Sequence, residues 1–330
     1  MIDYSKFAVR PPCRSNPCKS NPYKSNPYKS NHGVALVTAL VVIAIVTSLA
    51  AAVSLGQQVW LRQVQNQQDR VQAAQVEVAA LDWALAVIAN DTRTSNVTDH
   101  LAEDWALSVP PIPVEGGLVR GVITDAQGRF NLNNLLRGNN VSAVDVAVLQ
   151  RLLRQLEIDP AVTEAVLDWI DADGVARPGG ADDLDYLRMT PPYRAANQPF
   201  ASVEELRMVA GFDAISVEAL LPFVTALPVT TSINVNTAPV EVLSAAVNVP
   251  QDQLRKLVDE RVTKPIKSMS DLQAYLPQKL PPLPVGLIGF RTDFFEVELQ
   301  SSFGELLRVA HALVQRTGDR VDVLWQSQRL

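Results

Sequence analysis

The sequence predicts an α+β protein in which a long N-terminal helix packs on an antiparallel sheet, and a large all-α domain is inserted between the strands of that sheet. Three observations lead to this prediction. A charge-free apolar stretch continues as an amphipathic helical pattern, strand-like segments lie at both ends of the remaining chain, and helical segments with turn signals fill its middle. With 330 residues, 47% of them apolar, the chain can bury such a core.

The long helix is predicted from two adjoining segments. Residues 34–55 contain no Asp, Glu, Lys or Arg, and a 22-residue helix at about 1.5 Å per residue crosses the apolar core of a bilayer, about 30 Å thick. In residues 57–90, apolar side chains recur at three- and four-residue steps. Because no proline interrupts either segment, we expect one helix, half in a membrane and half packed against a folded domain.

Residues 1–33 form a basic leader with six Lys or Arg and one acidic residue, Asp3. A five-residue repeat, S-N-P-x-K, fills much of it, and this polar, proline-punctuated segment is predicted to be disordered. Its positive charge predicts that it stays in the cytoplasm while the C-terminal body lies across the membrane. The leader also holds both cysteines, Cys13 and Cys18, so the body has no disulfide framework.

The body, residues 34–330, is acidic and lacks the motifs of common catalytic sites. It carries 23 basic and 34 acidic residues, a net charge of −11, and such a body repels phosphate backbones, so nucleic acid is not an expected partner. His100 and His311 are its two histidines, and no phosphate loop or G-x-S-x-G elbow is present. We therefore predict a protein without enzymatic activity, with His311 as a packed strand residue.

Strands are predicted at the two ends of the body. Residues 118–136 read as a hairpin, with alternating apolar residues in LVRGVIT and a turn at DAQG. Residues 293–301, 305–315 and 320–327 read as three further strands separated by SFG and TGD. The first group belongs to the first part of a domain, residues 56–136, and the second to the C-terminal strands of the same domain, residues 289–330.

Residues 137–288 are predicted as the inserted helical domain, which contains a faint internal repeat. FNLNNLL opens one copy and INVNTAPVEVL the other, and each copy continues with a pair of helices. The repeat predicts two modules, about 137–225 and 230–288, resembling SAM-like or helix-hairpin-helix folds. Ser202 and Ser270 (or Ser268) are predicted helix N-caps, because each is followed by acidic residues in a first helical turn.

An acidic loop follows the second helix of the first module. Asp168, Asp171, Asp173, Asp182, Asp183 and Asp185 surround a Gly/Pro bend in which Arg177 is the opposing charge. Crowded carboxylates are hard oxygen ligands that favour Ca²⁺, although the spacing does not fit an EF-hand. The loop therefore predicts a calcium site with Asp171, Asp173, Asp182, Asp183 and Asp185 as ligands. The alternative is a solvated acidic loop in which Asp173 and Asp182 serve as turn and cap residues.

The junction between the leader and the apolar helix resembles the type IV pilin superfamily. SNHG followed by VALVTALVVIAIVTSLAA is similar to the site of a prepilin peptidase, which would cut between Gly33 and Val34 and leave Val34 open to N-methylation. Most members have Glu at the fifth mature position, where this chain has Thr38. A buried carboxylate in lipid needs a cation, so Thr38 marks a subunit that lacks the usual fibre contact. This absence is characteristic of the K-type minor pseudopilins.

Four further motifs resemble the K-type pseudopilins of type II secretion: LDWIDADG, DDLDYL, PPYRAANQPFASVEELRMVAGF and INVNTAPVEVLSA. The resemblance covers most of the chain from residue 33 onward. It implies a pilin-like α+β domain, residues 56–136 and 289–330, that holds the inserted α-domain. It also implies bound calcium, an inner-membrane anchor with a periplasmic body, and a place at the pseudopilus tip beside the I-type and J-type minor pseudopilins. There the protein would start or cap the pseudopilus that exports folded proteins across the outer membrane, and secreted proteins are further candidate partners.

The alternative function is a membrane-anchored DNA-uptake receptor, because helix-hairpin-helix modules in such receptors begin much as INVNTAPVEVL does. Those modules hold DNA phosphates with glycine-containing turns aided by Lys or Arg. The equivalent turns here, LEIDPAVTE and VNVPQDQLR, lack glycine and are not basic. We therefore favour a structural or protein-binding use of the modules.

Overall fold

The structure, a computed structural model, describes residues 32–94, 98–138 and 140–329. Most of the predicted leader, including Cys13 and Cys18, lies outside the described residues. The chain divides into two units, Met1–Gln63 and Val64–Leu330. Helix α1, His32–Thr94, contributes residues to both units, so each part of it is described with its own unit.

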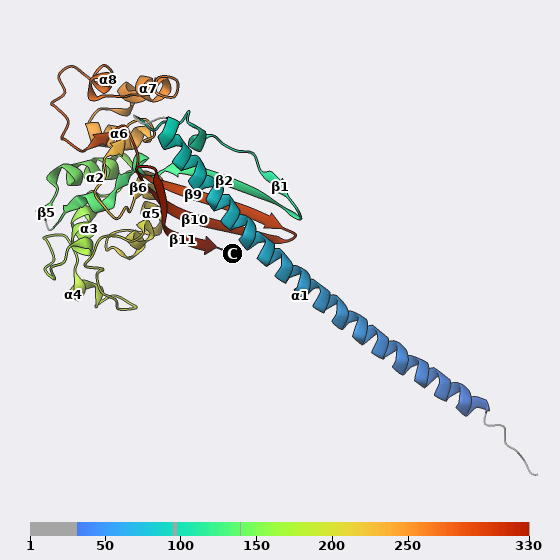
Figure 1. The fold of residues 1–330 in the computed structure, drawn as a ribbon. Coiled ribbons are helices and arrows are strands. Elements are labelled where there is room, and N and C mark those ends of the chain that lie inside the picture. The colour runs from blue at the N-terminus through green and yellow to red at the C-terminus, as the bar shows by residue number, and fades with distance from the viewer. Residues whose placement is uncertain (1–31, 95–97, 139, 330) are drawn as a thin grey trace, which may run out of the picture. The chain divides into compact units, whose positions relative to one another are not determined.

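In the first unit, α1 is the predicted membrane helix (Figure 1). An 18-residue window has a mean hydropathy of 2.7 and is wholly exposed, and among the described residues no other helix is long and apolar enough to cross a membrane. The hydroxyls of Thr47 and Ser48 donate to the carbonyl oxygens of Ile43 and Ala44 at 2.8 and 2.7 Å. These polar groups are thus satisfied within the helix, as an apolar surrounding requires.

The second unit is built on a five-stranded antiparallel sheet in the order β1-β2-β9-β10-β11. The strands are β1 (Ile112–Val114), β2 (Gly117–Asp125), β9 (Phe294–Phe303), β10 (Leu306–Thr317) and β11 (Arg320–Arg329). The three C-terminal strands confirm the prediction for that region. Because β2 and β9 are neighbours, the chain leaves the sheet after β2 and returns to it about 170 residues later, which makes the segment between them an insertion.

The hairpin predicted over residues 118–136 is wrong. After β2 the chain enters a short 3-10 helix, η2 (Ala126–Gly128), because the Asp125 side chain accepts from the Gln127 amide at 2.7 Å and caps that turn. The next strand, β3 (Phe130–Asn131), does not return to β2 but pairs in parallel with β6 (Val224–Thr225). The strand that forms a hairpin with β2 is β1, which lies on the side of β2 away from β9.

The C-terminal half of α1 packs on one face of the sheet. Its buried residues Leu81, Ala84 and Ile88 follow the helical period, and they form a core cluster with Trp105 and with residues of β9 and β10 such as Phe295. Burying one Leu or Ile side chain contributes about 1.5–3 kcal/mol. This part of the helix is therefore held by the sheet, in line with the prediction of one helix with two environments.

The inserted domain consists of short helices with small strand pairs. Its helical elements are η3 (Leu132–Leu135), α2 (Ala143–Gln155), α3 (Val162–Ile170), α4 (Asp183–Tyr186), η4 (Val203–Met208), α5 (Ala214–Leu220), η5 (Leu221–Phe223), α6 (Val240–Val247), α7 (Gln251–Glu260) and α8 (Met269–Gln273). Besides β3 and β6 it contains β4 (Leu136–Arg137) paired with β5 (Asn140–Val141), and β7 (Ile233–Asn234) paired with β8 (Ile288–Gly289). A further 3-10 helix, η1 (Asp104–Ala106), precedes β1. One buried apolar cluster extends through the whole insertion.

The internal repeat is visible in the structure. We name the segment from β3 to β6 the first module and the segment from β7 to β8 the second module, since each is enclosed by a parallel pair of two-residue strands. In the first, the Asn133 amide donates to the Phe200 carbonyl and accepts from its N–H, at 3.0 and 2.8 Å. In the second, Asn236 does the same with Ile266, at 3.0 and 2.8 Å. The predicted domain boundaries themselves remain predictions.

We call this two-bond contact of an asparagine side chain with the backbone of a distant residue an asparagine clamp. In both modules the clamped residue, Phe200 or Ile266, is followed two positions later by a serine N-cap. Ser202 caps η4 in a capping box with Glu205, as predicted. In the second module Ser268 caps α8, because its hydroxyl accepts from the Asp271 N–H at 3.2 Å. The cap is thus Ser268, the second of the two serines considered from the sequence, while Ser270 lies inside the helix.

Candidate functional site

Gly33, Val34 and Thr38 lie in the first turns of α1. A β-carbon added at Gly33 would have no heavy atom within 4 Å, and Val34 is 61% exposed. The Thr38 hydroxyl donates to the Ala35 carbonyl at 3.0 Å, so it is satisfied within its own helix. Within residues 32–63, the described part of this unit, Gly33 and Val34 are open to solvent, and the predicted cleavage remains a prediction.

The acidic loop is held by Arg177. Asp168, fully buried at the end of α3, accepts from the Arg177 backbone N–H at 3.0 Å and from its guanidinium at 2.5 Å. The same guanidinium donates to Asp171. A β-carbon at Gly180 would lie 1.9 Å from Oδ2 of Asp168, so glycine alone lets the loop close over this carboxylate. Asp168 and Arg177 therefore form the buried centre of the loop.

Three of the predicted ligands occupy the start of α4. Asp182 is the N-cap, and Asp185 completes a capping box with it. Asp183 accepts from the Ala195 N–H at 3.1 Å. Carboxylates at a helix N-terminus are stabilised by its free N–H groups and its dipole. Asp182 thus has the cap role that the alternative interpretation assigned to it, and the capping box adds Asp185.

The other two predicted ligands lie at the opposite end of the loop. Asp171 and Asp173 line a cavity of about 620 Å³ together with Asn197. Asp173 also accepts from the Val175 N–H at 3.0 Å, in the turn predicted for it. Burial raises the pKa of Asp171, while the bond from Arg177 opposes this rise. The structure therefore brings Asp171 and Asp173 to one cavity whose lining does not include the three aspartates at α4.

Two oxygen atoms at this cavity suit a hard cation, beside the Arg177 guanidinium that also lines it. Oδ1 of Asp171 and Oδ1 of Asn197 are buried and accept no hydrogen bond within the described part of the chain, and the same is true of Oδ2 of Asp182 at α4. A buried oxygen without a donor is costly, and oxygen is the ligand atom that calcium prefers. Asn197, which the sequence did not single out, also has a left-handed backbone, with φ 48°.

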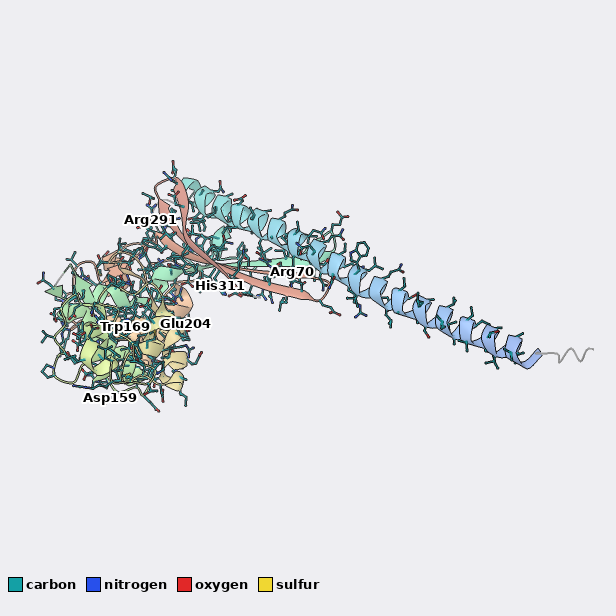
Figure 2. The ribbon with its side chains drawn as sticks, turned by 90° about the horizontal axis from the view of Figure 1, so that it is seen from below. Arg70, Asp159, Trp169, Glu204, Arg291 and His311 are labelled. Carbon is teal, nitrogen blue, oxygen red and sulfur yellow. The ribbon has the colours of Figure 1, made fainter. Side chains whose placement is uncertain are left out.

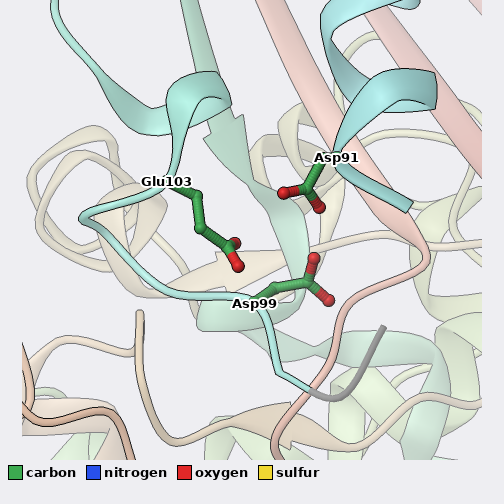
Figure 3. Close-up of side chains that lie close together, drawn as sticks. All are labelled: Asp91, Asp99 and Glu103. Carbon is green, nitrogen blue, oxygen red and sulfur yellow. The ribbon is translucent and has the colours of Figure 1, made fainter. Parts of the chain in front are cut away.

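A second carboxylate cluster lies outside the inserted domain and was missed from the sequence. Ligand atoms of Asp91, Asp99 and Glu103 all lie within 4.8 Å of one another, and no other such group of three was found among the described residues (Figure 3). The fully buried Arg316 donates to Asp91 at 2.8 Å and to Asp99 at 2.6 Å.

This cluster has a structural role. Burial, with Glu103 and Asp99 nearby, raises the pKa of Asp91 to about 7. Asp91 and Arg316 are 225 residues apart in sequence, so no local pattern could have predicted their contact. Together they fasten the end of α1 to β10.

The insertion is joined to the sheet by buried polar contacts. Asp125, at the end of β2, accepts from Asn234 at 2.8 Å and from Thr237 at 2.6 Å. Gln127 donates to the Ser232 carbonyl at 3.1 Å. Because each such bond contributes about 0.5–1.5 kcal/mol and leaves a costly group if broken, the second module is fixed at the junction with the sheet.

Comparisons with known proteins agree with this architecture. Two family models described as type II secretion system protein K match residues 128–229 and 233–285. Protein K of Pseudomonas aeruginosa is 36% identical over 299 residues, covering 87% of this chain and 90% of that protein. Protein K of Pectobacterium carotovorum is 31% identical over 312 residues, covering 88% and 94%.

A solved structure gives the same result for the fold. A chain in the crystal structure of the GspK-GspI-GspJ complex from enterotoxigenic Escherichia coli matches with a TM-score of 0.71 and 26% identity, covering 81% of this chain and 99% of that chain. The two chains therefore share one fold over 81% of this chain. The chain belongs to the type II secretion system protein K family.

Proposed function

We propose that this chain is the minor pseudopilin at the tip of a type II secretion pseudopilus, in complex with I-type and J-type minor pseudopilins, where it initiates or caps assembly. The observation that carries this proposal is the insertion of two helical modules between the paired strands β2 and β9. Subunits of a helical fibre stack through their N-terminal helices, and a bulky insertion is tolerable where no further subunit must stack above it. The solved complex of a related chain with GspI and GspJ supports the choice of partners.

Thr38 supports the terminal position. A carboxylate at this depth in lipid needs a cation from a neighbouring subunit. The Thr38 hydroxyl is satisfied by the Ala35 carbonyl, so this subunit places no such demand on a neighbour. It can enter the fibre without the contact that other subunits make.

Processing and location follow from the same helix. A prepilin peptidase cuts between Gly33 and Val34, and the new N-terminus is methylated. The wholly exposed apolar window of α1 anchors the mature chain in the inner membrane. The body then lies in the periplasm, as the basic leader requires. Mass spectrometry of the mature protein should find Val34 first, and an intact leader would refute this step.

Calcium binding is proposed for the acidic loop. Asp171, Asp173 and Asn197 would hold the ion in the cavity that they line, with carboxylate and amide oxygens. Asp182, Asp183 and Asp185 hold the start of α4, and Asp182 offers one further buried oxygen. The ion would supply positive charge that offsets the crowded carboxylates and fixes the loop.

The role is structural, without catalysis. His311 lies on the sheet strand β10 opposite Glu298 of β9, as predicted for a strand residue (Figure 2). His100 is occupied with Glu103 and the Ala102 N–H. The protein would act through its assembly into the pseudopilus.

Co-purification tests the proposed function. The full chain, extracted in detergent, should retain the I-type and J-type pseudopilins of the same organism, and cells without it should assemble fewer pseudopili. Gel shifts with duplex DNA at low salt are the counter-test. Tight, salt-sensitive DNA binding without retention of the two pseudopilins would overturn the proposal in favour of a DNA receptor.

A further inference from the structure

The second module gathers the lysines of an otherwise acidic body. After the leader, the lysines of the chain are Lys256, Lys264, Lys267 and Lys279, and all four lie within 24 residues of this module. The second module carries six basic and five acidic residues, whereas the first carries seven basic and fourteen acidic residues. The two modules therefore present surfaces of different charge.

Basic side chains line two hollows along α7. One hollow, of about 350 Å³, lies where α7 begins and is lined by Arg151 and Arg154 from α2 and by Gln251. The other, of about 750 Å³, is lined by Lys256, Lys264 and Lys267, together with residues that include Tyr275 and Glu260. We name the five cations Arg151, Arg154, Lys256, Lys264 and Lys267 the basic strip.

Carboxylates of the chain neutralise the basic strip only in part, because Glu260 and Asp271 line the lysine hollow and, among the described residues, no carboxylate lines the other, which leaves five cations against two carboxylates. In the part of the chain that the structure describes, its one ion pair is Lys256 with Glu260, at 3.8 Å between two exposed side chains. Nε of Arg151 donates to the Ala245 carbonyl at 2.6 Å, which fixes the guanidinium without a carboxylate. By contrast, the four arginines that follow in the first module all pair with carboxylates: Arg177, Arg188, Arg194 and Arg207.

This arrangement has an energetic cost. Arg151 and Arg154 are three positions apart on α2, where like charges destabilise a helix. Burial, with Arg154 nearby, lowers the pKa of Arg151, which shows that its charge is held in an unfavourable setting. This excess of cations over carboxylates along the two hollows is suited to binding an external anion.

We propose that the basic strip binds an acidic segment of a protein partner. Carboxylate groups of an extended segment would lie in the two hollows along α7, bound by the guanidinium groups in one hollow and by the lysines in the other. A duplex nucleic acid carries one charge per about 1.7 Å and would extend over the first module, whose excess of carboxylates repels it. A short acidic protein segment avoids this repulsion.

Binding of a defined acidic probe tests the proposal. The full chain in detergent is titrated with a fluorescein-labelled peptide of repeated Glu-Glu-Ser, and anisotropy is recorded at low and at physiological salt. The peptide should bind more weakly as salt rises. The exposed-lysine variant K256Q/K264Q/K267Q and the variant R151Q/R154Q should each weaken binding by roughly tenfold, because charged pairs at such sites set affinity.

The matched control is R188Q/R194Q, which removes two exposed arginines from the first module and should leave binding within about twofold. Melting temperatures of all variants establish that they fold. Absence of peptide binding, an equal loss in the control, or tighter binding of a 20-base-pair duplex than of the peptide would overturn the proposal. Retention of the I-type and J-type subunits is measured on the same variants. A failure of peptide binding can then be told apart from a failure of the proposed tip complex.

Discussion

The two helical modules share a framework and differ in the segment that follows their second helix. Each begins with an N-x-N pair, and in both the first asparagine accepts from the N–H of the second, Asn131 from Asn133 and Asn234 from Asn236. The clamped partner lies 67 residues away in the first module but 30 residues away in the second. The extra chain of the first module includes the acidic loop.

The comparison shows which features belong to the scaffold and which were added to it. The turn between the paired helices has a left-handed residue in both modules, Glu157 with φ 59° and Asn248 with φ 55°. Neither position is glycine, although glycine adopts this conformation at the lowest cost. The asparagine clamps and the turns are therefore common to both modules, while the carboxylates of one and the lysines of the other are surface features built upon them.

The largest effect is expected from removing a clamp. Asn133→Ala leaves three buried backbone groups without a partner, the N–H and carbonyl of Phe200 and the carbonyl of Leu227, and should lower the free energy of unfolding by about 4 kcal/mol. Asn236→Ala leaves two, on Ile266, and should cost about 3 kcal/mol.

Chemical denaturation of the full chain measures both clamp variants, with the exposed Asn140→Ala as control. Equal, small losses at both clamps would mean that the shared framework is held by apolar packing alone.

The second largest effect is expected from calcium, which should stabilise the first module. If the first module binds the ion, saturating calcium raises the melting temperature of the parent chain by an amount equivalent to about 3 kcal/mol at 100 times the dissociation constant. D171A/D173A should abolish this rise, whereas D252A/D259A, which removes two exposed aspartates from α7, should preserve it. A parent chain that does not respond to calcium would contradict the metal site.

The third largest effect is expected from a substitution that disturbs the closed acidic loop. Gly180→Ala places a β-carbon against Oδ2 of Asp168, so the loop must move away from the Arg177 pair at a cost of about 2 kcal/mol. The loop should then become accessible to protease while the second module stays protected. Substituting Gly174, which has open space around it, provides the control. If Gly180→Ala left the loop as resistant to protease as the parent chain, the close contact with Asp168 would not be needed to keep the loop closed.

The smallest effect concerns the serine caps. Ser202→Ala and Ser268→Ala should each cost about 1 kcal/mol, because each leaves a first-turn N–H without its acceptor. Ser270→Ala, within α8, should cost less than Ser268→Ala. Thermal denaturation resolves these differences, and a larger loss at Ser270 would contradict the assigned cap.

Sequence patterns predicted the elements whose period is local. The apolar face of α1, the three C-terminal strands and the Ser202 cap all depend on spacing within a few residues. The prediction of a hairpin over residues 118–136 was wrong because a hairpin turn and a short capped 3-10 turn have similar sequences at DAQG. The Asp125 side chain accepts from the Gln127 N–H and stabilises the 3-10 turn. The repeat was visible from FNLNNLL and INVNTAPVEVL, but the clamps were not.

Within the candidate site, the sequence located the acidic loop but not the division of labour among its aspartates. Asp182 and Asp185 turned out to hold a helix start, while Asn197 joined Asp171 at the cavity. The cap roles depend on contacts within three residues, whereas Asn197 reaches the cavity of Asp171 only through the tertiary fold. Carboxylate composition indicates the kind of ion, whereas a ligand set requires positions in space.

The sequence by itself determined the membrane helix, the two-ended sheet with an insertion, the repeat and the family, because hydrophobic period and ordered motifs are properties of the chain. The tertiary structure decided how the parts are joined. Asp91 meets Arg316 across 225 residues, and Asn234 meets Asp125 across 109. Such contacts satisfy buried charges and amides that have no local partner, and their free energy becomes available only when the distant segments fold together.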